Sequence, residues 1–347
     1  MFEAVMMLCL GATDLCRPVL LPGYEAATEA GCAARLAASP PDPGGFPPGL
    51  SLGEAPICRP SGAALALSEV APGVLVHRGA VAEADAANGA DIANIAAVIG
   101  ERAVAVIDSG GARGVGEALW RAIRMRTDLP VSHVILTHMH PDHVFGASVL
   151  REAGAQVVGH AGLARALADR QENYLESLAT LIGVEQAIGT EAPVIDIEVA
   201  DAAQIDLGGR ILALRAWPEA HTPNDLTVYD TKSGILFAGD LVFDEHVPAL
   251  DGSVLGWQAV LSDLAADPAG QVVPGHGGPL LPWPAGADDT RRYLGVLAAD
   301  TRAAIAAGER MADAVGHIAG AERDRWQLFD AFNARNATVA FAELEWE

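Results

Sequence analysis

The chain has 347 residues, of which 51% are hydrophobic and 19% are charged, a composition typical of a globular protein with a large core. Its formal net charge of -23 argues against binding to nucleic acid or to an anionic membrane surface, because those partners need Lys and Arg to neutralise phosphate. No apolar run approaches the roughly 18 residues of a membrane-spanning helix, so we expect no membrane insertion. A small-molecule substrate is the expected partner, and the oligomeric state stays open.

The predicted elements begin with a strand over Phe2–Leu10 and an Ala-rich helix over Tyr24–Ala38. The stretch from Ser39 to Gly49 is rich in Pro and Gly, which excludes regular structure and predicts a linker. We therefore expect two parts. Residues 1–60 form a small disulfide-bearing segment that includes this linker, and residues 61–347 form one large domain.

The N-terminal part carries all the cysteines of the chain, which are Cys9, Cys16, Cys32 and Cys58. Their clustering outside any metal-binding spacing favours two disulfides and an oxidising compartment. Three pairings are possible, and loop geometry alone leads us to favour Cys16 with Cys32 and Cys9 with Cys58. Buried free thiols in a cytoplasmic protein are the alternative. The apolar start lacks a basic region and makes a poor signal peptide, so disulfides would imply an export signal that this sequence does not display.

Two blocks of strands and helices follow, as indicated by β-branched apolar runs, turn residues and helical periodicity. The first block is predicted to have strands over Gly73–His77, Ile92–Ile99, Ala103–Ile107, Val131–Leu136 and Gln156–Val158, and helices over Gly114–Arg126, Pro141–Glu152 and Ala161–Leu181. The second is predicted to have strands over Val194–Val199, Gln204–Leu207, Arg210–Ala216, Leu226–Asp230, Ile235–Ala238 and Gln271–Val273, and helices over Gly256–Ala266, Asp288–Ile318 and Asp324–Glu345. This pattern predicts a large α/β domain.

One predicted strand leads directly into a cluster of metal-ligating side chains. The sequence Val134–Gly146, VILTHMHPDHVFG, presents His138, His140, Asp142 and His143 within six residues. Alternate side chains of an extended chain project to one side, so we expect the first three to point the same way, with His143 beside them at the turn. Imidazole and carboxylate groups without a thiolate suit Zn, Fe or Mn.

Three further candidates close or follow later apolar runs. They are His221 in PEAHTPNDLTVYD, Asp240 in GILFAGDLVF and His276 in VVPGHGG. Together with the HxHxDH motif, their order and local sequences resemble the metallo-β-lactamase-fold hydrolases. The resemblance implies a four-layer αβ/βα sandwich in which ligands from both halves of the chain meet at one sheet edge. Within this family, a histidine at position 140 and an aspartate at position 240 resemble the ligand pattern of the zinc hydrolases that have a bridging aspartate.

The resemblance also assigns the ligands of two metal ions. The first ion would take His138, His140 and His221, the second would take Asp142, His143 and His276, and Asp240 would bridge them. The expected cofactors are two Zn²⁺, with Fe or Mn as alternatives. Three neutral imidazoles leave a position open for a water that ionises near neutral pH, and the resulting hydroxide is the expected nucleophile. Asp142 is the expected catalytic carboxylate, which orients this nucleophile and passes its proton to the leaving atom.

Weaker candidates lie near these motifs. Asn224 could donate a hydrogen bond to an oxyanion, with local turn capping as the alternative. His246 and Asp251 lie on a loop after Asp240 that should overhang the metals, and we consider them for substrate contact against the alternative of an ordinary surface loop. Asp108 is expected to orient a ligand imidazole, because metal-bound histidines usually donate their second N–H to an acceptor.

Features over nearly the whole chain resemble one subgroup, the zinc metallohydrolases associated with quinoprotein relay systems and periplasmic sulfur oxidation. They are the loop VPALDGSVLGW, the long helix after PGHG, the ending NARNATVAFAELEWE and the cysteine-bearing N-terminal segment. The subgroup implies export to the periplasm and an accessory role in quinoprotein dehydrogenase pathways, without indicating a substrate. The function we expect is a zinc hydrolase that acts on a small ester, amide, lactam or thioester. A mononuclear iron sulfur dioxygenase of the same fold and a non-catalytic metal-binding accessory protein are the alternatives. The lack of a basic cluster for glutathione carboxylates argues against a true glyoxalase II.

Overall fold

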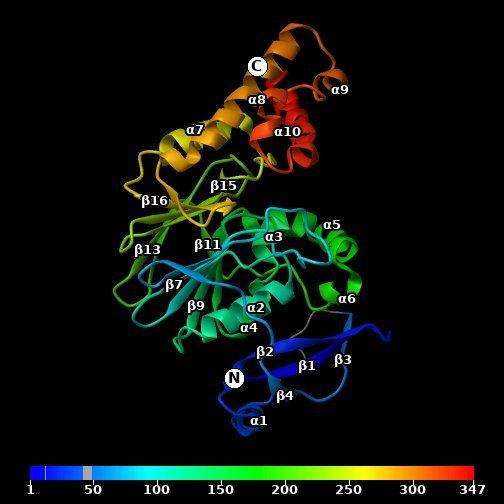
Figure 1. Ribbon diagram of the computed structural model, residues 1–347, viewed down its shortest axis with the longest axis vertical. Coiled ribbons are helices and arrows are strands. Elements are labelled where there is room, and N and C mark those ends of the chain that lie inside the picture. Colours follow the sequence, from blue (N-terminus) through cyan, green and yellow to red (C-terminus); the bar gives the residue numbers. More distant parts are fainter. Residues whose placement is uncertain (12, 42–48) are drawn as a thin grey trace.

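The computed structural model describes residues 1–11, 13–41 and 49–347, so the centre of the predicted linker lies outside the described residues. Three β-sheets and the helices around them make up the described chain (Figure 1). The N-terminal sheet lies at one end of the long axis, and the C-terminal helices lie at the other. The predicted strand Phe2–Leu10 is present with these bounds.

The N-terminal sheet is built around its first strand. Its elements are β1 (Phe2–Leu10), β2 (Cys16–Ala26), α1 (Glu29–Ala38), β3 (Leu50–Leu52) and β4 (Ile57–Pro60). β1 pairs with β2 in an antiparallel hairpin and with β3 and β4 along its other edge. The sequence prediction missed β2 and started the helix too early. The helix begins only at Glu29, because the hydroxyl of Thr28 accepts a hydrogen bond from the backbone N–H of Gly31 and caps it.

The disulfide pairing predicted from loop geometry is wrong, although two disulfides are present as expected. Cys9 is bonded to Cys16, and Cys32 is bonded to Cys58. Cys9 and Cys16 lie directly opposite one another in the β1–β2 hairpin, with Cα atoms 4.0 Å apart, and this contact requires the strand that the prediction missed. The second bond joins α1 to β4.

Two larger sheets form the body of the molecule. The first has the strand order β11 (Ile197–Val199), β10 (Gln156–His160), β9 (Val131–Ile135), β8 (Val104–Ile107), β7 (Ile95–Ile99), β6 (Val74–His77) and β5 (Ser68–Ala71). The second has the order β12 (Ala202–Asp206), β13 (Ile211–Ala216), β14 (Leu226–Asp230), β15 (Ile235–Phe243), β16 (Gln271–His276) and β17 (Leu281–Pro282). Both sheets mix parallel and antiparallel pairs, as is common for large sheets.

Helices cover the outer face of each large sheet (Figure 1). On the first sheet they are α2 (Arg113–Arg124), α3 (Pro141–Val144), α4 (Ala147–Glu152), α5 (Leu163–Ile182) and α6 (Val184–Ala187). On the second they are α7 (Val254–Leu264), α8 (Asp288–Ala306), α9 (Met311–Ala314) and α10 (Phe329–Leu344), with 3₁₀ turns at Ala285–Ala287 and Gly320–Arg325. The helix predicted over Asp288–Ile318 is interrupted where Gly308 adopts a φ of 72°.

Three apolar clusters hold the layers together. The inner faces of the two sheets meet through side chains such as Val98 and Phe237. The outer face of the first sheet packs on its helices around Leu119, and that of the second packs around Trp257 and Leu297. Helix, sheet, sheet and helix therefore follow one another as layers, which confirms the predicted four-layer sandwich.

The N-terminal sheet is joined to the first helical layer by buried charges. The guanidinium of Arg17 on β2 lies 2.8 Å from the carboxylate of Glu117 on α2, and the same carboxylate accepts the backbone N–H of Leu20. Arg113 reaches from α2 to the carbonyl of Leu20 and to Glu152. The division into domains at residue 60 stays a prediction.

Arg210 connects the two large sheets at one end of the sandwich. Its Nε and Nη2 atoms donate to the carboxylate of Asp230 at the end of β14, and its Nη1 donates to the carbonyls of Pro72 and Ile99. Both charged side chains are almost fully buried. One guanidinium therefore links the second sheet to strand ends of the first sheet.

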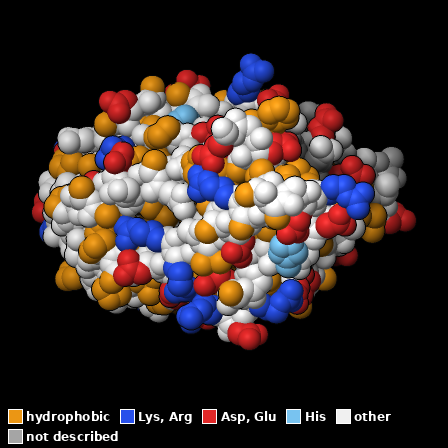
Figure 2. Space-filling view, turned by 90° about the horizontal axis from the view of Figure 1, so that it is seen from above, with side chains coloured by type: hydrophobic (Ala, Val, Ile, Leu, Met, Phe, Trp, Pro, Cys, Tyr) orange, Lys and Arg blue, Asp and Glu red, His pale blue; other side chains and the backbone are white. Residues whose placement is uncertain are grey.

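Acidic and basic side chains are mixed on the face of the molecule that Figure 2 displays. Figure 2 shows, on the face seen from above, Lys and Arg side chains scattered among Asp and Glu without gathering into one basic area. Within the described residues, every helix is too short or too polar to traverse a bilayer.

Candidate metal centre

The seven predicted metal ligands come together at one edge of the two large sheets. The connection after β9 and the short helix α3 carry four of them, the β13–β14 connection carries one, and β15 and β16 carry one each. In that order they are His138, His140, Asp142, His143, His221, Asp240 and His276. Their role as ligands stays a prediction, but residues far apart in the chain lie where the motif spacing placed them.

The candidate donor atoms fall into two groups that match the predicted ligand sets. One group is His138, His140, His221 and Asp240, and the other is Asp142, His143 and His276, with the atoms of each group within 4.8 Å of one another. Asp240 lies between them. One of its oxygens is 3.1 Å from His143 Nε2, and the other is 3.5 Å from His221 Nε2 and 3.4 Å from His276 Nε2.

Two glycines make room at the centre, Gly275 for the Asp240 carboxylate and Gly239 for the side chain of Thr137. A Cβ atom at Gly275 would lie 1.9 Å from Asp240 Oδ1. A Cβ atom at Gly239 would lie 2.6 Å from Thr137 Oγ1, and Gly239 has a φ of 52°, which L side chains rarely adopt. The glycines of the AGD and PGH sequences therefore allow the backbone to approach Thr137 and the Asp240 carboxylate closely.

The donor set fits metal ions. His138 Nε2, His143 Nε2 and Asp240 Oδ1 are buried and make no hydrogen bond within the described structure, an arrangement that is costly unless something else satisfies these atoms. Nitrogen and oxygen donors in groups of three or four suit Zn²⁺, and Fe or Mn would also be accepted. Metal ions bound here would satisfy all three atoms.

The carboxylates of the centre favour positive charge on His143 and His276. Burial opposes protonation of His276, but Asp240 and Asp142 outweigh it and raise the pKa of His276 to about 10. The pKa of His143 is also raised well above its usual value, because Asp240 and Asp108 outweigh burial. The imidazoles of His276 and His143 in turn hold the pKa of Asp240 well below its usual range against the effect of burial. A dication would be stabilised by the same carboxylates.

Asp108 orients two of the imidazoles, as the sequence predicted for one. Its carboxylate accepts a hydrogen bond of 2.8 Å from His143 Nδ1 and another of 2.9 Å from the hydroxyl of Thr137. That hydroxyl in turn lies 3.0 Å from His138 Nδ1 and accepts from it. Both rings are therefore held with Nε2 directed to the centre. Asp108 has a φ of 59°, a strained conformation for a non-glycine residue.

His140 is held from the opposite side by Asp251. His140 Nε2 donates to Asp251 Oδ2 over 3.2 Å, which leaves Nδ1 directed towards His221 Nε2, 3.1 Å away. The other Asp251 oxygen lies 3.2 Å from the guanidinium of Arg335 on α10. Burial opposes ionisation of Asp251, but His140 and Arg335 outweigh it and lower the pKa of Asp251 to about 2. Asp251 thus contacts a predicted ligand, whereas the sequence suggested contact with a substrate.

Replacing Asp251 with Ala is expected to weaken metal binding by about 10- to 100-fold, since an outer acceptor of this kind fixes the orientation of a ligand imidazole. Asp251→Asn keeps a hydrogen-bond acceptor without the charge. Its metal affinity should lie between those of the wild type and of Asp251→Ala. Titration with a competing chelator measures the affinity. Asp263→Ala, at an exposed position of α7, is the matched control. Unchanged affinity in Asp251→Ala would contradict the orienting role.

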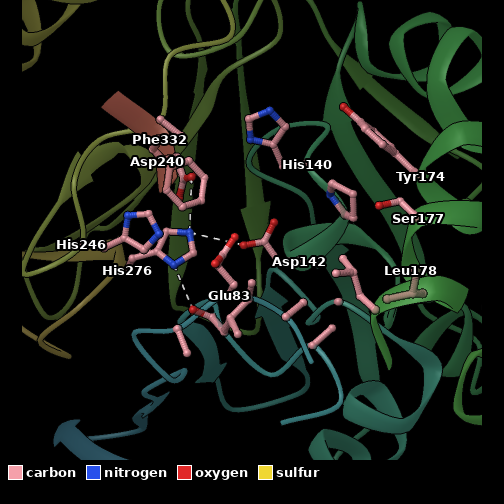
Figure 3. A pocket seen from close by; sticks show the side chains of 18 of the residues that line it. Glu83, His140, Asp142, Tyr174, Ser177, Leu178, Asp240, His246, His276 and Phe332 are labelled. Atoms are coloured by element: carbon pink, nitrogen blue, oxygen red, sulfur yellow. Dashed lines mark hydrogen bonds and ion pairs between the residues drawn. The ribbon is translucent and has the colours of Figure 1, made fainter. Parts of the chain in front are cut away.

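A cavity of about 340 Å³ opens onto the centre. His140, Asp142, Asp240 and His276 form its floor, and His246 forms part of its wall (Figure 3). His246 packs with its ring centroid 5.0 Å from that of His276. Its place in the wall is compatible with the predicted contact to substrate.

Asn224 is buried away from this cavity. Its amide donates to the sulfur of Met139, and its backbone N–H donates to the hydroxyl of Thr222. Thr222 also donates to Asp225, so these residues form a compact turn beside His221. The structure therefore favours the alternative of turn capping for Asn224.

Sequence reasoning missed several residues of the cavity wall. Tyr174, Ser177, Leu178 and Leu181 line it from α5, and Phe332 and Arg335 line it from α10. The residues on α5 are spaced by three and four positions and share one helix face. The predicted helix over Ala161–Leu181 contained this signal, but the spacing alone did not reveal which structure the face would meet.

Comparison with protein families identifies the fold family. The profile described as the Metallo-beta-lactamase superfamily matches residues 88–276, more than half of the chain and the full span from before the HxHxDH motif to His276. The chain belongs to this superfamily. Membership of the metallo-β-lactamase superfamily is consistent with a metal-dependent hydrolase.

Curated relatives within the metallo-β-lactamase superfamily match part of the chain. A hydroxyacylglutathione hydrolase from Albidiferax ferrireducens is 33% identical over 172 residues, which are 48% of this chain and 55% of that protein. A hydroxyacylglutathione hydrolase from Pseudomonas paraeruginosa is 29% identical over 171 residues, which are 48% of this chain and 54% of that protein. The chain thus spans about half the length of these relatives.

Solved structures show the same metallo-β-lactamase fold at low sequence identity. A metallo-beta-lactamase from Pontibacter korlensis has a TM-score of 0.53 and 23% identity, and the match covers 67% of this chain and 99% of that one. The sec-alkylsulfatase Pisa1 from Pseudomonas sp. has a TM-score of 0.62 and 14% identity over 81% of this chain and 50% of that one. These similarities support the architecture and do not indicate a substrate.

Proposed function

We propose that the protein is a dinuclear zinc hydrolase that cleaves a small thioester, with esters, amides and lactams as related substrates. The observation that carries the proposal is the position of Asp240 between two groups of donor atoms, each of which is complete enough to hold one ion. The similarity to two hydroxyacylglutathione hydrolases over about half their length favours a thioester among the substrates.

The residues of the site have separate tasks in this proposal. Two bound zinc ions would supply a water that ionises near neutral pH. Asp142 faces the cavity with a carboxylate oxygen 3.3 Å from His276 Nε2, in a position to orient that water and to carry its proton to the leaving atom. Burial opposes ionisation of Asp142, but His143 and His276 outweigh it and lower its pKa, so the carboxylate is ionised at neutral pH.

We also propose a periplasmic location and an accessory role in a quinoprotein or sulfur-oxidation pathway. The two disulfides support a location outside the cytoplasm, because such bonds persist in oxidising compartments. The pathway rests on sequence features of the loop after Asp240 and of the C-terminal helix.

Elemental analysis combined with hydrolysis assays tests the proposal. We expect two zinc ions per chain and turnover of a thioester panel, with a chromogenic cephalosporin as the lactam substrate. A single iron ion with oxygen uptake on a persulfide substrate would contradict it and indicate the sulfur dioxygenase instead. Two bound ions without turnover of any substrate in the panel would indicate a non-catalytic protein.

A further inference from the structure

The walls of the cavity above the metal centre are mainly apolar. Leu178 and Leu181 lie on α5, Phe332 faces the cavity from α10, and Ala84 and Ile92 line it from the connection between β6 and β7 (Figure 3). Leu178 is buried, and Leu181 remains 48% exposed next to the opening. An apolar group that enters from the opening would therefore pass along apolar side chains down to the predicted metal ligands.

Charge around the same cavity is sparse. Apart from the predicted ligands, the charged side chains among the described residues that line it are Glu83 and Arg335. Arg335 lies 3.2 Å from the half-buried carboxylate of Asp251, which already balances its charge. Glu83 is exposed and adds negative charge to the wall. On the wall, away from the metal centre on the floor, a carboxylate of the ligand would meet Glu83, while Arg335 is already paired with Asp251.

We infer that the cavity selects thioesters or esters that join an apolar acyl group to an uncharged thiol or alcohol, and that it disfavours conjugates of glutathione. The inference rests on the proposed hydrolase function and names its substrate class. The leucines of α5 and Phe332 hold the acyl chain, while Glu83 repels the carboxylates of a glutathione moiety. The substrate class thus differs from the one that the names of the curated relatives describe.

Binding of non-hydrolysable thioethers to the zinc-loaded protein tests this class without relying on catalysis. The probes are S-hexyl-N-acetylcysteamine, its S-methyl analogue and S-hexylglutathione, measured by isothermal titration calorimetry. Each fully buried methylene favours binding by about fourfold. We therefore expect the uncharged hexyl compound to bind at least about tenfold more tightly than its methyl analogue, and at least about tenfold more tightly than S-hexylglutathione.

Two surface substitutions assign the effects to the named residues. Leu181→Asn should lower the ratio of hexyl to methyl affinity by at least about threefold, whereas Leu15→Asn, at a similarly exposed leucine of the N-terminal part, should leave it unchanged. Glu83→Gln should narrow the difference in affinity between S-hexyl-N-acetylcysteamine and S-hexylglutathione. Both positions are exposed enough to tolerate the polar side chain.

The possible outcomes separate the two proposals. S-hexylglutathione binding as tightly as the uncharged hexyl compound, or equal affinity for hexyl and methyl, would overturn the inferred substrate class. Selective binding of the uncharged hexyl compound supports it whether or not catalysis occurs. Failure to hydrolyse the corresponding hexanoyl thioester with two metals bound would then contradict the hydrolase function alone.

Discussion

Asp240→Asn is expected to reduce the metal content from two ions per chain towards one and to lower turnover by more than about 100-fold. Asp240 places one oxygen towards His143 and the other towards His221 and His276, so it serves both groups of donors. Outer partners of metal ligands typically account for about 10- to 100-fold in affinity or activity, and loss of a shared ligand should exceed that. An amide has only one oxygen acceptor and no charge to hold two cations.

Elemental analysis and steady-state kinetics on untagged protein measure this effect. Asp263→Asn is the matched control, because Asp263 is exposed on α7 and belongs to neither group of candidate donors. Thermal unfolding of each variant establishes that the fold is retained. Two ions per chain together with full activity in Asp240→Asn would show that Asp240 does not bridge the metals.

Arg210→Met is expected to destabilise the protein by about 3–5 kcal/mol, because it leaves the buried carboxylate of Asp230 without its cation. The substitution also removes the hydrogen bonds to Pro72 and Ile99 that connect the two sheets. Chemical denaturation followed by tryptophan fluorescence measures the free energy of unfolding. The metal centre contains neither residue, so metal content in the folded protein should be retained.

A second substitution and a change of pH separate charge from packing at this pair. Arg210→Met combined with Asp230→Asn should be more stable than Arg210→Met alone, because no unpaired charge stays buried.

Burial raises the pKa of Asp230, but Arg210 and Ser233 outweigh it and lower the pKa below its usual value. The pair therefore stabilises the fold above about pH 4 and loses this contribution as the pH falls through the lowered pKa. The difference between wild type and Arg210→Met should shrink over the same range.

The metal centre could be predicted from sequence because its parts are local. HxHxDH places four donors on one strand exit and one short helix, so they lie close together without tertiary information. His221, Asp240 and His276 each follow or end an apolar run, so a sheet fold delivers them to strand ends. That these strand ends share one edge of the sheets was predicted from the order of the motifs and their resemblance to a known family.

The N-terminal part shows where local reasoning failed. The chain from Cys16 to Ala26 contains Pro18, Pro22 and Gly23, which are residues that weaken a strand prediction. Its strand forms by pairing with β1, and that pairing brings Cys9 opposite Cys16. Because the disulfide partners were chosen without this hairpin, both predicted bonds were wrong even though the number of bonds was right.

By itself, the sequence determined the large α/β class, the clustering of donors around HxHxDH and the expectation that Asp108 orients an imidazole. These follow from periodicity, strand alternation and the chemistry of short motifs, which act over a few residues. Only the tertiary structure decided that Asp251 and Arg335 support His140, and that faces of α5 and α10 form one apolar cavity above the centre. Those contacts join residues at least 84 positions apart, and their partners are set by the packing of helices on sheets, which no local pattern in one chain encodes.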